Sequence, residues 1–260
     1  MLKILKYSFY DLIRSRWSYV YFAFYLFLGI VLLFLNNDLS KAVITLMNVI
    51  IVLVPLIGTI FGVMYYYNST EFTELLLAQP LKRSSIFLGQ YLGVSLSLSM
   101  SLVLGLGLPF VFYGLFKSNA IWDFSLLLIT GTFLTFIFTA LAFNIALSHE
   151  NKIKGFGYAI LLWLFLTIIY DGIFLLSLIL FEEYPLDKLS LIGTMLNPVD
   201  LSRTLILLKL DISALLGYTG AIFKQFFGTN RGLILSFLML FLWMILPILM
   251  VVIKAKKKDF

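Results

Sequence analysis

The run Phe22-Ala-Phe-Tyr-Leu-Phe-Leu-Gly-Ile-Val-Leu-Leu-Phe-Leu35 contains no charged side chain. With its flanking residues it is long enough to cross a hydrocarbon core of about 30 Å, because a helix rises about 1.5 Å per residue. Five similar stretches follow, and the six predicted spans are residues 17–35, 42–66, 86–116, 121–147, 156–180 and 232–253. These runs lack the alternating polarity of barrel strands, and only helices or closed barrels satisfy backbone groups in lipid. We therefore predict an all-α integral membrane protein with six transmembrane helices in one domain, residues 1–260.

Composition excludes several kinds of chemistry. The chain is 62% hydrophobic and 12% charged, and it has no cysteine, so disulfides, thiolate metal sites and thiol redox chemistry are excluded. The one histidine, His149, lies in a connector beside Glu150, where we expect it to be solvated; one imidazole does not make a metal site. We also expect the methionines to serve packing rather than a soft-metal path. No basic stretch is interleaved with aromatic residues, so no nucleic acid partner is expected.

The basic residues are distributed unequally between the two sides of the predicted bundle. Twelve Lys and Arg residues fall on the side that holds both termini, and seven fall on the other side. Five of those seven lie in one long segment, residues 181–231, where the positive-inside rule is weaker. We predict that both termini are cytoplasmic.

Residues 1–16 precede the first span and predict an amphipathic helix. Such a helix lies in the membrane interface with its apolar side on the lipid. It serves either as a basic anchor that fixes topology or as a docking surface for a cytosolic partner. Its predicted apolar face consists of Leu2, Leu5, Phe9, Leu12 and Ile13.

Small residues recur at every fourth position of the third span. They are Gly89, Gly93, Ser97, Ser101 and Gly105, and the second span has a shorter version, Gly58 and Gly62. The serine alternation in this region would suggest a strand in a soluble protein. In lipid we predict a helix whose serine hydroxyls bond to their own i−4 carbonyls. A ridge of small residues lets another helix approach closely, either within the chain or at a two-fold dimer seam.

The segment 181–231 predicts two amphipathic helices on the outer face. Asn197-Pro198-Val199-Asp200 has the pattern of a helix start, with an Asn cap and Pro at the first helical position. A second helix is predicted from Asp211 to Gly228. The two helices either cap the bundle or bind a partner outside.

The connector between the second and third spans is a short helix with opposite charges at its ends. Glu71 and Glu74 precede Leu75–Ala78, Pro80 stops the helix, and Lys82 and Arg83 follow. This order of charges suits the helix dipole. The spacing alone is also satisfied by a simple amphipathic connector.

Four parts of the chain resemble one protein family. Glu-Leu-Leu-Leu-Ala-Gln-Pro-Leu-Lys-Arg-Ser-Ser-Ile-Phe-Leu-Gly-Gln-Tyr-Leu-Gly, residues 74–93, resembles the signature of ABC-2-type transporter permeases, and Tyr7–Trp17 resembles their elbow helix. Ile169–Asp171 and Leu196–Arg203 resemble the NosY-like branch, which matures nitrous oxide reductase. The chain departs from the family at Gln90, where Lys is usual, and at residues 66–73, where an acidic, Gly-containing run is usual.

The resemblance implies a permease domain in a bacterial inner (cytoplasmic) membrane. It implies a homodimer that carries two copies of a cytosolic ATPase subunit, which would hold ATP and Mg. This chain has no Gly-x-x-x-x-Gly-Lys-(Ser/Thr) loop, so we expect no cofactor in it and no enzymatic activity of its own. The residues expected to couple it to the ATPase are Glu71, Glu74, Leu75, Leu76, Leu77, Gln79, Pro80, Lys82 and Arg83.

The NosY-like resemblance further implies a periplasmic β-helical NosD-like protein on the outer helices and a role in copper-site assembly. The candidate contacts to that protein are Asn197, Pro198, Asp200 and Arg203. Two alternatives stay open: a mechanical transmitter that moves no small molecule, or an exporter of another substrate.

Asp171 lies in the outer half of the fifth span. A charge at membrane depth costs a few kcal/mol, so it marks a functional position by default. The alternative is that Asp171 lies near the headgroups and only bonds a neighbouring helix. An intramembrane hydrolase would need paired carboxylates or a Ser–His pair at this depth, which the sequence does not offer.

Overall fold

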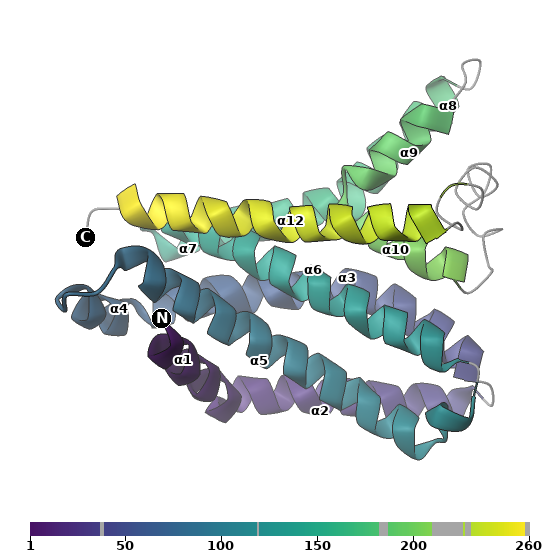
Figure 1. The fold of residues 1–260 in the computed structure, drawn as a ribbon, viewed down its shortest axis with the longest axis horizontal. Helices are drawn as coiled ribbons and strands as arrows, with labels where there is room; N and C mark the ends of the chain where they lie inside the picture. The colour runs from purple at the N-terminus through teal and green to yellow at the C-terminus, as the bar shows by residue number, and fades with distance from the viewer. Residues whose placement is uncertain (37–38, 119, 182–186, 210–225, 227–229, 258–260) are drawn as a thin grey trace.

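The computed structural model describes residues 1–36, 39–118, 120–181, 187–209, 226 and 230–257, and this part of the chain is helical without strands (Figure 1). The elements are α1 (Leu2–Arg14), α2 (Arg16–Leu35), α3 (Leu39–Asn68), α4 (Thr70–Leu77), α5 (Arg83–Phe112), η1 (Leu115–Lys117), α6 (Ile121–Ser148), α7 (Lys152–Leu164), the π-helical turn η2 (Phe165–Ile169), α8 (Tyr170–Leu180), α9 (Asp187–Met195), α10 (Pro198–Lys209) and α12 (Asn230–Lys257).

Six segments of the described chain are long and apolar enough to cross a membrane. They are Arg16–Leu35, Leu39–Asn68, Arg83–Phe112, Ile121–Ser148, Lys152–Leu180 and Gly232–Lys257. The prediction of an all-α membrane protein with six spanning helices is therefore confirmed.

Two spans differ in detail from the expected ones. The third ends at Phe112 rather than at residue 116, because Gly114 adopts φ 95°, a left-handed conformation that glycine tolerates, and the chain then forms η1. The fifth span is not one regular helix. The π turn η2 separates α7 from α8.

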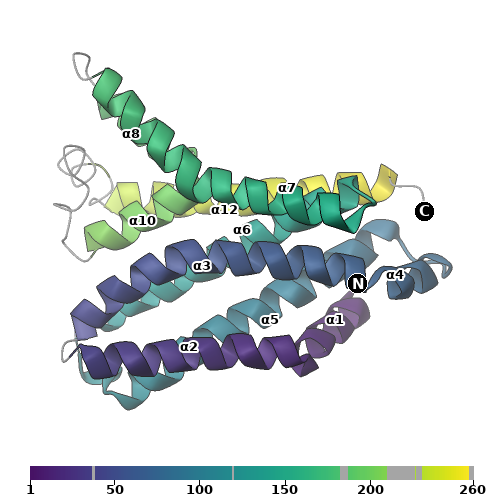
Figure 2. The same cartoon turned by 180° about the vertical axis from the view of Figure 1, so that it is seen from behind.

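The spanning helices lie side by side along the long axis of the molecule. The start of α1, the whole of α4 and the end of α12 lie at one end of the bundle, which we call the terminal end (Figure 1). The opposite, distal end holds α9 and α10. Viewed from behind, α3 lies between α2 and α7, and α8 projects away from the bundle beyond η2 (Figure 2).

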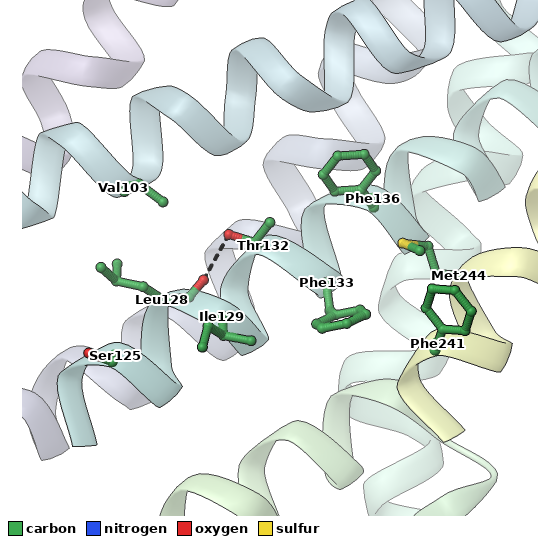
Figure 3. Close-up of a pocket in the computed structure, with 9 residues that line it drawn as sticks. All are labelled: Val103, Ser125, Leu128, Ile129, Thr132, Phe133, Phe136, Phe241 and Met244. Atoms are coloured by element: carbon green, nitrogen blue, oxygen red, sulfur yellow. Dashed lines mark hydrogen bonds between the residues drawn. The ribbon is translucent and has the colours of Figure 1, made fainter. Parts of the chain in front are cut away.

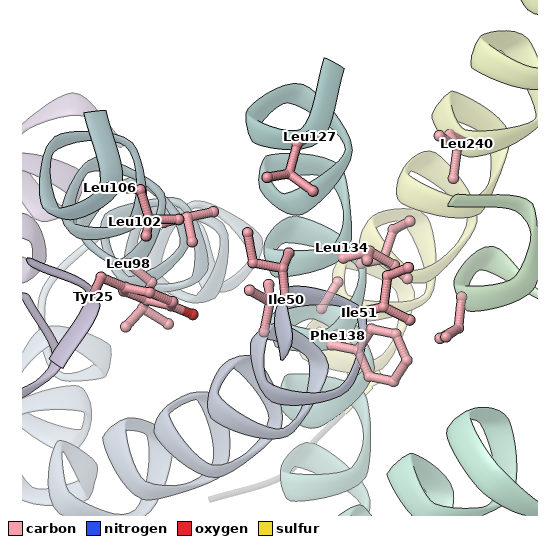
Figure 4. Packing of buried hydrophobic residues seen from close by; sticks show 14 of the residues in the cluster. Tyr25, Ile50, Ile51, Leu98, Leu102, Leu106, Leu127, Leu134, Phe138 and Leu240 are labelled. Atoms are coloured by element: carbon pink, nitrogen blue, oxygen red, sulfur yellow. The ribbon is translucent and has the colours of Figure 1, made fainter. Parts of the chain in front are cut away.

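The core forms where α3, α5 and α6 meet. Figure 4 shows Ile50 of α3, Leu102 of α5 and Leu127 of α6 in this cluster, and all three are fully buried. Gly62 of α3 lies against α6 so closely that an added Cβ would be 2.8 Å from the Ala142 Cβ, and at Gly58 an added Cβ would be 3.4 Å from the Thr139 Oγ1. Such close approach strengthens dispersion contacts, which drive helix association in lipid.

The ridge of small residues on α5 is covered by the chain's own first two helices. A Cβ added at Gly89 would lie 3.0 Å from the Ile4 Cβ, one at Gly93 would lie 2.6 Å from the Ser8 Cβ, and one at Gly105 would lie 2.8 Å from the Tyr25 Cβ. Ser97 and Ser101 are buried between these positions, and the Ser101 hydroxyl donates to the Ser97 carbonyl at 3.0 Å. The contacts therefore place this ridge inside the chain rather than at a seam between copies.

The face by which α1 packs differs from the expected one. Its buried residues are Ile4, Ser8 and Leu12, whereas Leu2 is 79% exposed. Gly89 and Gly93 of α5 leave room for the side of α1 that carries Ile4 and Ser8. We call this contact the seat of α1. Leu2, on the side expected to face lipid, is exposed, whereas the packing of Ile4 and Ser8 against α5 was not predicted.

The outer segment also differs from a pair of surface helices. α10 begins at Pro198 as expected, but it is buried nearly all round and contacts α3, α6 and α12. The fully or nearly buried apolar residues of α10 are Val199, Leu201, Leu205, Ile206 and Leu207. Helix α9 was not expected. The predicted helix Asp211–Gly228 lies outside the described residues except for Phe226.

Candidate functional site

The connector α4 projects from the terminal end of the bundle (Figure 1). It begins directly after α3 and ends at Leu77, and Pro80 lies in the turn that leads to α5. Leu75 is 69% exposed, although it is a large apolar residue. The other exposed members of the expected coupling set are Glu71, Glu74, Gln79, Pro80, Lys82 and Arg83, and Leu76 and Leu77 are half-buried.

Two contacts fix α4 to the bundle. The Gln90 side chain of α5 is fully buried, and its Nε2 donates to the Thr73 hydroxyl at 2.8 Å. The Phe72 ring stacks on the Tyr7 ring of α1, with centroids 4.5 Å apart. Because both contacts lie on the inner side of α4, its outer side is presented as a rigid surface. Gln90, a departure from the family pattern, is thus part of this support, which sequence reasoning missed.

A polar cluster at the distal half joins two segments that the sequence singled out separately. Asp171 lies in the first turn of α8, and its Oδ2 accepts from Nη1 of Arg203 in α10 at 2.7 Å. The same Nη1 lies 3.7 Å from Oδ1 of Asp200. The two side chains of the short pair are only 31% and 27% exposed, so water screens their attraction less than at an open surface.

Asn197 links this cluster to the π turn. Its Nδ2 donates to the Leu166 carbonyl in η2 at 2.7 Å and to Asp200 Oδ2 at 3.0 Å. Its Oδ1 accepts from the Val199 amide at 3.0 Å, which is the predicted helix cap. A π turn shifts the helical hydrogen-bond register, and such turns are frequent at functional sites. Here the turn supplies a carbonyl for the cap residue of α10.

Two further hydrogen bonds hold the turn between α9 and α10. The Tyr170 hydroxyl donates to the Gly193 carbonyl at 2.7 Å. The Trp243 indole of α12 donates to the Met195 carbonyl at 3.1 Å. The outer segment is therefore tied to both the fifth and the sixth spanning segments.

The charges of the cluster are unequal, since two carboxylates face one guanidinium. Burial, with a smaller contribution from the negative charge of Asp171, raises the pKa of Asp200 to about 6, although Arg203 and Asn197 act in the opposite direction. Asp200 Oδ1 is buried and accepts no hydrogen bond within the described part of the chain. The cluster can therefore take up a proton close to neutral pH.

The residues expected to contact an outer partner lie mostly inside the fold. Asn197, Pro198 and Asp200 are buried, and Arg203 is engaged by Asp171. The reason is that α10 inserts between α3, α6 and α12 instead of lying on the surface. For Asp171, the contact observed is the bond to a neighbouring helix.

His149 is half-buried rather than solvated. Its ring packs on Tyr158 with centroids 4.6 Å apart, and its Nδ1 lies 2.9 Å from the Ile145 carbonyl. In addition, the Tyr67 hydroxyl donates to the His149 carbonyl at 2.6 Å. These contacts give His149 a structural place in the turn between α6 and α7.

Comparison with known proteins gives one informative similarity. No protein-family profile matches the chain. The chain is 27% identical over 134 residues to the "Probable ABC transporter permease protein NosY" of Stutzerimonas stutzeri, a match that covers 50% of this chain and 49% of that protein. The match thus spans about half the length of this curated relative. The chain is a six-span α-helical membrane protein that is similar, over half its length, to an ABC transporter permease.

Proposed function

We propose that this chain is the membrane subunit of an ABC transporter and that α4 transmits the motion of a separate ATPase. Two copies of the ATPase subunit would hold ATP and Mg, and two copies of this chain would form the membrane part. The observation that carries the proposal is the projecting α4, which exposes Leu75 while its inner side is fixed to α1 and α5. The similarity to a permease supports it.

The supports of α4 define a path for the motion. A displacement of α4 would pass through Thr73 and Gln90 to α5, and through Phe72 and Tyr7 to α1. Helix α5 runs the length of the bundle, so it would carry the displacement toward the distal end. There α10, wedged between three spanning helices, would respond through the Asp171–Arg203 contact.

The proposal assigns the terminal end to the cytoplasm of a bacterium and the chain to its inner membrane. The support is the excess of Lys and Arg at that end, including Lys254, Lys256 and Lys257 in the last turn of α12. The ATPase would then approach α4 from the cytosol.

The finer assignment to nitrous oxide reductase maturation rests on the NosY-like resemblance at residues 169–171 and 196–203. Under this proposal a periplasmic β-helical protein would sit on the outer segment. Because Asn197 and Asp200 are buried, its contacts would fall on exposed apolar residues nearby, such as Ile192 and Leu196.

A second candidate is a mechanical transmitter through which no hydrophilic solute passes. A groove of about 440 Å³ lies between α5, α6 and α12. Its walls are mostly apolar side chains, such as Phe136 and Met244 (Figure 3). Its two hydroxyls already donate to their own helix, Ser125 to Ile121 at 2.6 Å and Thr132 to Leu128 at 2.8 Å. The groove therefore offers lipid chains or packing helices a better environment than ions or sugars. This favours the transmitter over a polar pathway through one copy.

The proposal is tested in the complex assembled with its ATPase subunit. Leu75→Asp places a charge on the exposed surface of α4 and should lower ATP turnover of the complex by about tenfold, because an unpaired carboxylate is costly to bury against the ATPase. Ile153→Asp, an exposed apolar residue of α7 at the same end, is the matched control and should leave turnover unchanged. Equal turnover in both variants, with the ATPase still bound, would contradict the proposal.

A further inference from the structure

A pocket of about 330 Å³ lies where α1, α2, α3 and α4 meet at the terminal end. Its walls include the aromatic rings of Tyr7, Trp17, Tyr65 and Phe72, together with the carboxylate of Asp11. Aromatic faces attract cations through their quadrupole, and most strongly when the cation is partly desolvated. The composition of the walls therefore favours a positively charged occupant.

The negative charge of Asp11 in this pocket has no basic partner among the residues that the structure describes. Among the residues that the structure describes, no Lys or Arg side chain lies within 4 Å of Asp11. The Tyr65 hydroxyl lies beside Ser8 and Asp11, yet it is buried and completes no hydrogen bond within the described part of the chain. An added cation would offset the charge of Asp11.

The position of the pocket identifies the source of the cation. It lies at the first turn of α2 and the last turns of α3, where the apolar spans begin and end, and this is the depth of lipid headgroups. Trp17 both lines the pocket and begins an exposed apolar stripe along α2, which continues through Val20, Phe24 and Phe27. A phospholipid could thus place its headgroup in the pocket and an acyl chain along this stripe.

We propose that this pocket binds the ammonium headgroup of a zwitterionic phospholipid, held by Asp11 and the aromatic walls. The exposed Arg14 and Arg16, on either side of the pocket residue Ser15, would lie near the lipid phosphate. The occupant would contact Phe72 and Ser69 as well as α1. It would therefore brace α4, and the position of the connector would depend on lipid composition.

The test is native mass spectrometry of the full chain with equal amounts of phosphatidylethanolamine and phosphatidylglycerol of identical acyl chains. The wild-type protein should retain the ethanolamine lipid preferentially. Asp11→Asn should lower that retention by about fivefold and leave the glycerol lipid unchanged, since one charge-assisted and cation–π site is lost. Glu150→Gln, an exposed carboxylate in the turn between α6 and α7 and outside the pocket, is the matched control and should behave as wild type.

Tyr7→Leu keeps the bulk of the wall but removes an aromatic face, so it should also lower ethanolamine lipid retention. It provides a second reading if Asp11→Asn does not fold. Unchanged retention in the folded variants, or equal loss of both lipids, would overturn the proposal. So would an Asp11→Asn protein that keeps its lipid but loses the ATPase subunit, because the pocket would then receive a basic side chain of a protein.

Discussion

Nη1 of Arg203 in α10 lies 2.7 Å from Oδ2 of Asp171 in α8, although the two residues are 32 positions apart in the chain. The contact closes a loop that contains α9 and the turn before α10. Because α8 has no buried residue of its own, this ion pair and the Tyr170–Gly193 hydrogen bond supply its polar links to the outer segment. We call the Asp171–Arg203 ion pair the latch, because it joins the projecting helix α8 to α10 in the bundle.

Removing one partner of this latch should destabilise the protein. Asp171→Asn should lower the free energy of unfolding by about 1 kcal/mol, because the hydrogen bond from Arg203 loses the charge of its acceptor while both side chains are partly solvated. Thermal unfolding in detergent measures the loss, and Glu71→Gln on exposed α4 should show none. A double-mutant cycle of Asp171→Ala and Arg203→Ala should give a clear coupling energy. Strictly additive effects would mean that the pair contributes nothing.

The raised pKa of Asp200 predicts a dependence of stability on pH. In the folded protein Asp200 binds its proton up to about pH 6, whereas its ordinary pKa is 3.8. The folded state therefore binds more protons between these values, and stability falls as pH rises from about 4 to 6 and then stays level. From pH 5 to pH 7.5 the loss should be about 1 kcal/mol.

Asp200→Asn removes the titrating group and keeps the shape of the side chain. Its unfolding midpoint should vary less between pH 5 and pH 7.5 than that of the wild type. The measurement is a thermal unfolding series over pH in one detergent. An identical pH profile in the variant would assign the dependence to another group.

Because α1 packs closely on α5, alanine substitutions at two glycines of α5 should change stability in different ways. Gly93→Ala would place a Cβ 2.6 Å from the Ser8 Cβ and 2.9 Å from the Phe9 backbone nitrogen, so α1 must shift. Overpacking of this kind costs about 1–3 kcal/mol. At Gly107 an added Cβ meets nothing within 4 Å, so Gly107→Ala should be neutral or stabilising. Thermal unfolding of the two variants decides the point, and similar midpoints would contradict this packing.

The hydrogen bond from Gln90 to Thr73 should hold α4 against α5. Gln90→Leu keeps a similar volume but cannot donate, so α4 should open more often. Hydrogen exchange of residues 70–80 should become faster, while exchange in α6 should not change. If the amides of α4 keep their protection, Gln90 does not support the connector.

The six spanning helices could be predicted from the sequence because each is a long apolar run. In lipid, the length and polarity of a segment decide whether it spans the membrane. The start of α10 could be predicted as well, since Asn197 and Pro198 act locally. The burial of α10 was missed, because its apolar side chains also suit a surface helix and only its packing between α3, α6 and α12 buries the other sides. The seat of α1 was missed for a similar reason, since Gly89 and Gly93 of another helix select the face.

The latch combined two residues that the sequence marked separately. Asp171 stood out as a charge in a span, and Arg203 as part of a motif in the outer segment. Their pairing depends on the π turn at Phe165–Ile169 and on the depth at which α10 inserts. Neither follows from local propensity. The support of α4 by Gln90 was likewise hidden, because it requires the packing of α4 against α5.

The central claim is that α4 receives a separate ATPase, and site-specific photo-crosslinking in the native membrane tests it most directly. A photoreactive residue at Gln79, exposed beside α4, should crosslink to a polypeptide that carries a Gly-x-x-x-x-Gly-Lys-(Ser/Thr) nucleotide-binding loop. The same residue at Lys117, exposed at the other end of the bundle, should not. Crosslinks from Gln79 to lipid alone, or the same products from both positions, would contradict the account.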